Sequence, residues 1–146
     1  MSLNDLVQIL QLSIGPVILI SGVGLLLLTI TNRFGRIIDF SRRLSADIRS
    51  ENSEKRKQSL VTQLQIQQRR ARVIRLSIIF AGLSALLAAL LIITLFIIAL
   101  LQLDVAWIIS VIFSICMMSL ITALVLFIAD VNISLNAIKL EISEAR

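Results

Sequence analysis

Three charged residues at the ends of long uncharged stretches are the first candidates for chemistry in this chain. Arg33 follows the first uncharged stretch, Arg75 precedes the second, and Asp130 follows the third. The stretches are residues 6–32, 76–103 and 105–129. An unpaired charge at the edge of an apolar layer is costly, so we expect Asp130 to form an ion pair with Arg33 or Arg75. The main interpretation is a structural clamp, and an acid that handles protons or ions is the alternative.

A second candidate site follows one face of the first uncharged stretch. Steps of seven residues give Gln8, Gly15, Gly22, Thr29, Arg36 and Arg43, and Asn32 lies on the same face. We name Gly15, Gly22, Thr29, Asn32 and Arg36 the span-one seam. Small residues let helix backbones approach closely in lipid, so helix packing is one interpretation. The other is that the seam lines a pathway for ions or small solutes, with arginines at its mouth.

Most other chemistry needs residues that the sequence does not offer. It has no His, no Tyr and a single Cys, Cys116. These counts exclude a disulfide or a His and Cys zinc site within one chain. The sequence also shows no carboxylate pair, no nucleophile with a base and no phosphate-binding glycine loop. We therefore expect no enzymatic activity, no catalytic residues, no cofactor and no metal.

The elements that carry these residues are predicted from composition. Apolar residues make up 58% of the chain and charged residues 16%. Each uncharged stretch exceeds the ~20 residues that a helix needs to cross a bilayer core. We predict an all-α integral membrane protein, a single membrane domain over residues 1–146. Its three transmembrane helices span residues 6–32, 76–102 and 105–130, with a kink at Gly15-Pro16.

The basic segment 33–75 is predicted to form a helical hairpin that continues the first two spans. Apolar and small residues repeat at helical spacing on both sides of a break at 50–53, and Asn52 or Ser53 would cap the second helix. The first side has Phe34, Ile37, Ser41, Leu44 and Ile48, and the second has Leu60, Leu64, Gln67, Ala71 and Ile74. A C-terminal helix over 131–146 repeats the pattern with Val131, Leu135, Ile138 and Ile142. These faces predict a coiled-coil-like stalk, and basic arms lying flat on anionic lipid are the alternative.

The charge distribution predicts the orientation. Residues 32–75 hold twelve Lys and Arg against four Asp and Glu, whereas residues 1–11, the turn at Asp104 and residues 130–146 each carry a net charge of −1. Basic segments are retained on the cytoplasmic side. We therefore expect an outside amino terminus, an inside carboxy terminus and a cytoplasmic hairpin. The bilayer is the expected partner, with anionic lipid at the basic hairpin, and nucleic acid is not expected.

One stretch resembles a known family. Residues 16–44 read PVILISGVGLLLLTITNRFGRIIDFSRRL. They resemble the bacterial membrane family catalogued as domain of unknown function twenty-seven twenty-one. The resemblance is carried by Ser21, Gly24, the leucine run 25–28, Thr29, Thr31, Asn32, Arg33, Arg36 and Asp39. It implies a three-span protein of the bacterial inner membrane and no particular activity.

The function expected from these features is non-enzymatic. Three helices bury little surface against one another, and the span-one seam must pack on something. We therefore expect a homo-oligomer that forms an ion or small-solute pathway lined by the first span. A structural or regulatory scaffold with a basic cytoplasmic stalk is one alternative. The other is an insertase-like membrane chaperone, because the predicted topology is similar to that of the membrane insertase superfamily.

Overall fold

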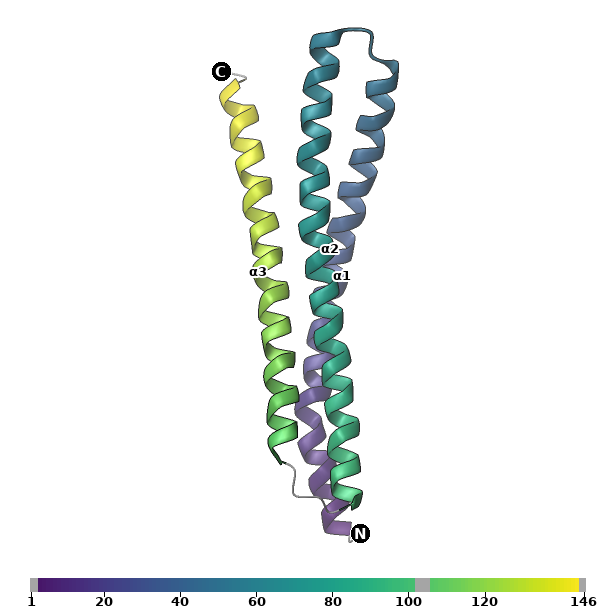
Figure 1. The fold of residues 1–146 in the computed structure, drawn as a ribbon, viewed down its shortest axis with the longest axis vertical. Coiled ribbons are helices and arrows are strands. Elements are labelled where there is room, and N and C mark those ends of the chain that lie inside the picture. Colours follow the sequence, from purple (N-terminus) through teal and green to yellow (C-terminus); the bar gives the residue numbers. More distant parts are fainter. Residues whose placement is uncertain (1–2, 102–105, 145–146) are drawn as a thin grey trace. The chain divides into compact units, whose positions relative to one another are not determined.

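The protein is all helical, as predicted. The computed structural model describes residues 3–101 and 106–144, and side chains at positions 7, 8, 10–101 and 106–134. It contains three helices, α1 (Leu3–Ser50), α2 (Glu54–Leu101) and α3 (Ala106–Glu144) (Figure 1). Each includes a segment long and apolar enough to cross a membrane.

The helices are far longer than a bilayer is thick. Both α1 and α2 contain 48 residues. At 1.5 Å per residue each extends about 72 Å, against a hydrocarbon core of about 30 Å. In any bilayer, large parts of α1 and α2 therefore lie outside the apolar layer. This length agrees with a hairpin that continues the first two spans.

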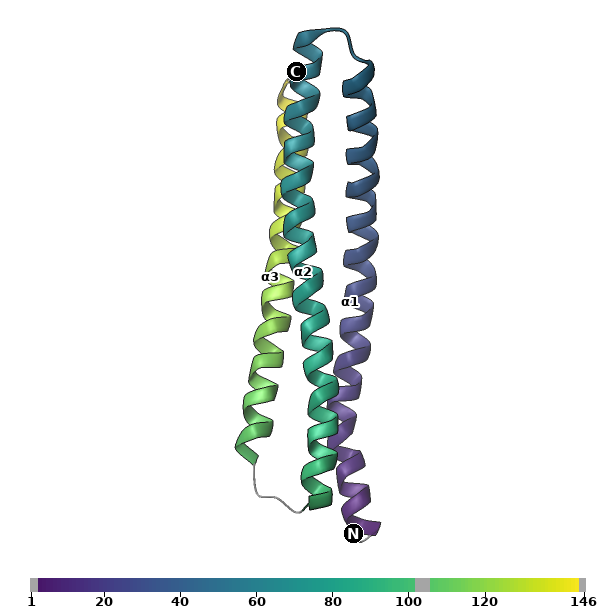
Figure 2. The ribbon, with the colours of Figure 1, turned by 45° about the vertical axis from the view of Figure 1, so that its right-hand side comes forward.

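The break between α1 and α2 falls where the sequence predicts it. Residues 51–53 are not helical and join the two helices (Figure 2). The carbonyl of Ser53 accepts the first helical hydrogen bond of α2, from the backbone N–H of Lys57 at 2.9 Å. Ser53 therefore occupies the N-cap position, one of the two candidates.

Gly15-Pro16 does not interrupt α1, which runs through both residues in one helix. An apolar environment stabilises helical backbone strongly, so a proline costs one hydrogen bond without ending the helix.

The chain divides into two compact units. The first unit comprises Met1–Leu28 and Ile79–Ala123, and the second comprises Thr29–Ile78 and Leu124–Arg146.

The core of the first unit is built from small residues. Val23, Ala81 and Ala123 pack together, and Ser84 and Ala88 are also buried. Polar contacts join α2 and α3: Ser119 Oγ donates to the carbonyl of Phe80 at 2.8 Å, and Cys116 Sγ donates to that of Ser84 at 3.2 Å and lies 3.5 Å from Ser84 Oγ. Many large apolar side chains of this unit are exposed, including Leu25, Leu86, Phe96 and Ile121. This is the reverse of a water-soluble surface and fits contact with lipid.

The second unit buries the two faces predicted for the hairpin. Its core includes Ile30, Ile37, Leu44 and Ile74. None of the ten residues predicted on these faces is exposed, as expected for residues on packed faces. In the C-terminal segment Val131 is half-buried, whereas the side chains of Leu135, Ile138 and Ile142 lie outside the described residues.

Candidate functional site

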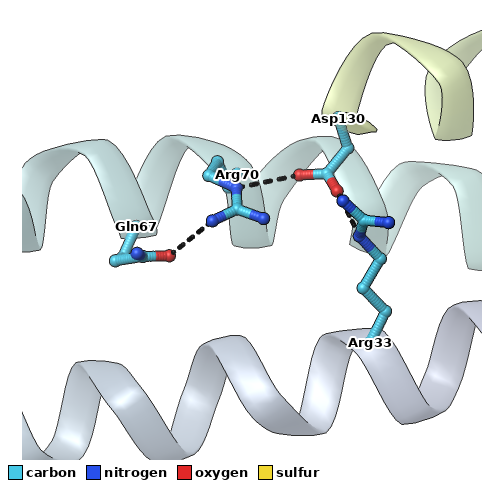
Figure 3. Close-up of polar contacts among 4 residues, drawn as sticks. All are labelled: Arg33, Gln67, Arg70 and Asp130. Carbon is cyan, nitrogen blue, oxygen red and sulfur yellow. Dashed lines mark hydrogen bonds and ion pairs between the residues drawn. The ribbon is translucent and has the colours of Figure 1, made fainter. Parts of the chain in front are cut away.

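A buried carboxylate joins three helices within the second unit. Asp130 of α3 is 0% exposed, and its Oδ2 lies 2.8 Å from Nε of Arg33 on α1. Its Oδ1 accepts a hydrogen bond of 3.2 Å from Nε of Arg70 on α2. Figure 3 shows the two guanidinium groups on either side of the carboxylate. We name Arg33, Arg70 and Asp130 the clamp.

Helical spacing places these residues together. Asp130 follows Cys116 and Ala123 at intervals of seven, and all three are buried. Seven residues are close to two turns, so the carboxylate continues the packed face of α3. On α2, Arg70 lies four residues before the buried Ile74 and three after the half-buried Gln67. Arg70 therefore lies on the side of α2 that carries the packed residues Gln67 and Ile74, not on the opposite side.

Further contacts orient the two arginines. Nη1 of Arg70 donates to Oε1 of Gln67 at 3.3 Å, as Figure 3 also shows. Cζ of Arg33 lies 5.7 Å from the ring centroid of Phe127, within range of a cation–π interaction. Oδ2 of Asp130 has no aligned hydrogen bond within the described part of the chain, so Arg33 holds it mainly by charge. The two bases and one acid leave the clamp with an excess positive charge.

Two of the three residues predicted for this ion pair come together, and the third does not. Arg33 and Asp130 are paired, but Arg75 is exposed and makes no ion pair among the described residues. Arg70, which the sequence analysis missed, supplies the second base. Arg75 follows the buried Ile74 directly, and one residue of a helix turns about 100°, so its side chain points away from the packed face.

A pocket of about 440 Å³ adjoins the clamp. It is lined by Arg33, Arg36, Ile37, Phe40, Gln67, Arg70 and Ser134, all within the second unit. Arg36 of the span-one seam therefore shares a pocket with both arginines of the clamp. Sequence periodicity placed Gln67 on a packed face but gave no sign of a pocket beside it.

The span-one seam is exposed along its whole length. Gly15, Gly22, Thr29, Asn32 and Arg36 are each exposed in the single chain. A Cβ atom built on Gly15 or Gly22 would meet nothing within 4 Å beyond its chain neighbours and the adjoining backbone of α1. The described residues of one chain therefore leave room for a second molecule to approach the backbone of α1 on this face.

A comparison with models of protein families shows to which family the chain belongs. A family model described as "Protein of unknown function (DUF2721)" matches residues 13–140. The chain belongs to this family. The match confirms the resemblance seen in residues 16–44, and it includes the clamp and the span-one seam. No curated protein and no solved structure matches the chain significantly.

In this member of the DUF2721 family, the described residues show which groups the site can offer to a ligand. They contain no group of three His, Cys, Asp or Glu side chains that could hold a metal ion. Cys116 is buried, where its thiol contacts Ser84. What the site offers is a cluster of guanidinium groups, which bind carboxylate and phosphate oxygens in pairs.

Proposed function

We propose that this chain is a non-enzymatic membrane protein that assembles with copies of itself and forms a pathway for ions or small solutes. The first helix would lie nearest the axis of the assembly. The span-one seam of each copy would then line the pathway.

The exposure of the seam is the observation that supports this proposal. Elsewhere on the first unit, the exposed surface carries Leu, Ile, Val and Phe, which suit contact with acyl chains. Gly15 and Gly22 do not, because they leave the backbone of α1 without side-chain cover, and Asn32 adds an exposed amide. Such a face is better covered by another helix or by water. In an oligomer with a central pathway, this face would contact both the helices of other copies and the water of the pathway.

Charge at one end of the seam supports a preference for anions. Arg36 is exposed and shares its pocket with Arg33 and Arg70. Repeated in each copy, these arginines would form a positive ring, which raises the local concentration of anions and repels cations.

The proposed orientation rests on the distribution of basic residues. The segment 32–75 carries most of the Lys and Arg of the chain and joins the first two spans. By the positive-inside rule it would lie in the cytoplasm, with the amino terminus outside and the carboxy terminus inside. Together with the family resemblance, this points to the bacterial inner membrane.

Liposome flux tests the proposed pathway. Purified full-length protein is reconstituted, and chloride and potassium release are measured for the native chain, Thr29→Leu and Thr31→Leu. We expect flux above that of empty liposomes, with chloride faster than potassium. Thr29→Leu should reduce it toward the level of empty liposomes, because a branched apolar side chain would narrow and dry the lining.

Thr31→Leu is the matched control, because Thr31 is an exposed threonine on α1 but off the seam. Its flux should stay close to that of the native chain. If the native protein gives no flux above empty liposomes, the pathway proposal is wrong.

A scaffold is the second candidate, favoured by the exposed arginines of the hairpin. Arg42, Arg69 and Arg72 all face outward and could bind anionic lipid or an acidic partner. An oligomer without flux would favour this function. An insertase-like role has less support, because the pocket in the first unit is lined by apolar and small residues such as Leu19, Ala88 and Phe113.

A further inference from the structure

The pocket beside the clamp is lined by more hydrogen-bond donors than Asp130 can pair with. Arg33, Arg36, Arg70, Gln67 and Ser134 all line it. Asp130, the acid that pairs with two of these arginines, is not among its lining residues. Residues that carry guanidinium, amide and hydroxyl groups therefore line a space of about 440 Å³, whereas Asp130, whose carboxylate offsets part of their charge, does not line it.

Several of these donors have no partner among the described residues. Arg33 meets Asp130 through Nε, and Arg70 is engaged through Nε and Nη1. The donor atoms that these contacts leave without a partner are both Nη atoms of Arg33, Nη2 of Arg70 and the whole guanidinium group of Arg36. Because Oε1 of Gln67 accepts from Arg70, its Nε2 also remains a donor.

The charges make this an anion site. Three arginines and one buried aspartate leave an excess of two positive charges at the pocket. Unused Nη atoms on neighbouring guanidinium groups match an anion with several oxygens, which accepts hydrogen bonds from more than one arginine.

The position of the pocket along the chain indicates which kind of anion it would bind. Arg33 directly follows the uncharged stretch 6–32, and Asp130 directly follows the stretch 105–129. In a membrane, the ends of such stretches lie at the depth of the lipid headgroups. Ile37 and Phe40 add an apolar wall, which suits the part of a lipid that adjoins its phosphate.

We propose that this pocket binds a phosphate group, carried by the headgroup of an anionic phospholipid or present as free inorganic phosphate. Every lining residue comes from one chain, so the site needs neither the oligomer nor the pathway proposed above. Asp130 holds two of the arginines in place, and Arg36 completes the pocket from outside the clamp.

Binding is measured on the purified full-length protein with two probes. Native mass spectrometry compares phosphatidylglycerol with phosphatidylcholine at equal concentrations in detergent. Thermal unfolding compares inorganic phosphate with chloride at equal ionic strength, because a ligand that binds only the folded state raises the melting temperature. The variant is Arg36→Gln, since Arg36 is exposed and makes no contact with Asp130.

Arg36→Gln should weaken binding of the effective probe about tenfold, the usual effect of losing a charge-assisted hydrogen bond. Arg43→Gln is the matched control, an exposed arginine seven residues further along α1 that does not line the pocket. It changes the net charge equally and should leave affinity close to native. Circular dichroism checks that both variants fold.

The two probes separate the two sources of phosphate. Preferential binding of phosphatidylglycerol that weakens only in Arg36→Gln would support a lipid headgroup. Stabilisation by inorganic phosphate that is lost only in Arg36→Gln would support free phosphate. Equal weakening in Arg36→Gln and Arg43→Gln would show diffuse attraction to a basic surface and overturn the proposal, as would the absence of binding by either probe.

Discussion

At the scale of single residues, the clamp depends on burial. A carboxylate with no exposed surface is tolerated only when bases and donors replace the water it has lost. Asp130 has two such bases, of which the Arg70 side chain is 12% exposed and the Arg33 side chain 26%. Arg70 is thus the better shielded partner, and its loss should be felt most.

Arg70→Gln should lower the free energy of unfolding by about 1–3 kcal/mol, because one hydrogen bond to a buried charge is lost while Arg33 remains. Arg75→Gln removes the same charge from an exposed position and should change it by less than about 0.5 kcal/mol. Thermal unfolding of the full chain in detergent measures both. A cost for Arg75→Gln equal to that for Arg70→Gln would restore Arg75 as a partner of Asp130.

The sequence predicted part of this site for a physical reason. Charges at the ends of uncharged stretches must meet a partner, so position along the chain predicted that Asp130 would pair with Arg33 or Arg75, and Arg33 is one of the two partners found. The choice between Arg70 and Arg75 depends on the face of α2, not on distance along the chain. Ile74 and Gln67 mark the packed face, and Arg70 lies beside both in helical spacing. That spacing was a usable signal, although the long reach of an arginine side chain weakens it.

At the scale of helices, small residues decide how α2 packs. The sequence places small residues at helical spacing at Ser77, Ala81, Ser84 and Ala88, and all four residues are buried. This pattern favours packing because small side chains let helices come close in lipid. The kink expected at Gly15-Pro16 stays a prediction, because α1 is assigned as one helix through both residues and a helix can bend at a proline without ending.

Ala81→Leu should destabilise the protein by about 1–3 kcal/mol, because the added atoms must enter the packed core of the first unit. Ala81 is 0% exposed, whereas Ala89 on the same helix is exposed. Ala89→Leu is therefore the control and should be close to neutral. Denaturant titration of both variants in detergent gives the comparison. If Ala89→Leu costs more than Ala81→Leu, α2 packs through a different face.

At the scale of the whole molecule, the proposed orientation can be tested by labelling from each side of the membrane. In a Cys116→Ala background, Ser53→Cys marks the turn between α1 and α2, and Ala106→Cys marks the start of α3; both positions are exposed. An impermeant maleimide should label Ala106→Cys in intact cells and Ser53→Cys only after the cells are opened. The reverse pattern would contradict the orientation inferred from charge.

The surface that one chain leaves exposed is the second feature at this scale. The periodicity of the first span predicted a small and polar face, and in the structure that face is exposed. What covers it depends on a second molecule, which the sequence of one chain does not specify. The central proposal is that copies of the chain meet through this face.

Disulfide crosslinking in native membranes tests that proposal most directly. Gly22→Cys places a thiol on the seam, and Leu28→Cys places one at a 59% exposed position off the seam, both in a Cys116→Ala background. Leu28 is preferred to Leu27 as the control, because Leu27 is half-buried against the core of the first unit. Mild oxidation should give covalent dimers with Gly22→Cys and few with Leu28→Cys. Equal or greater crosslinking through Leu28→Cys, or none through Gly22→Cys, would contradict assembly through the first span.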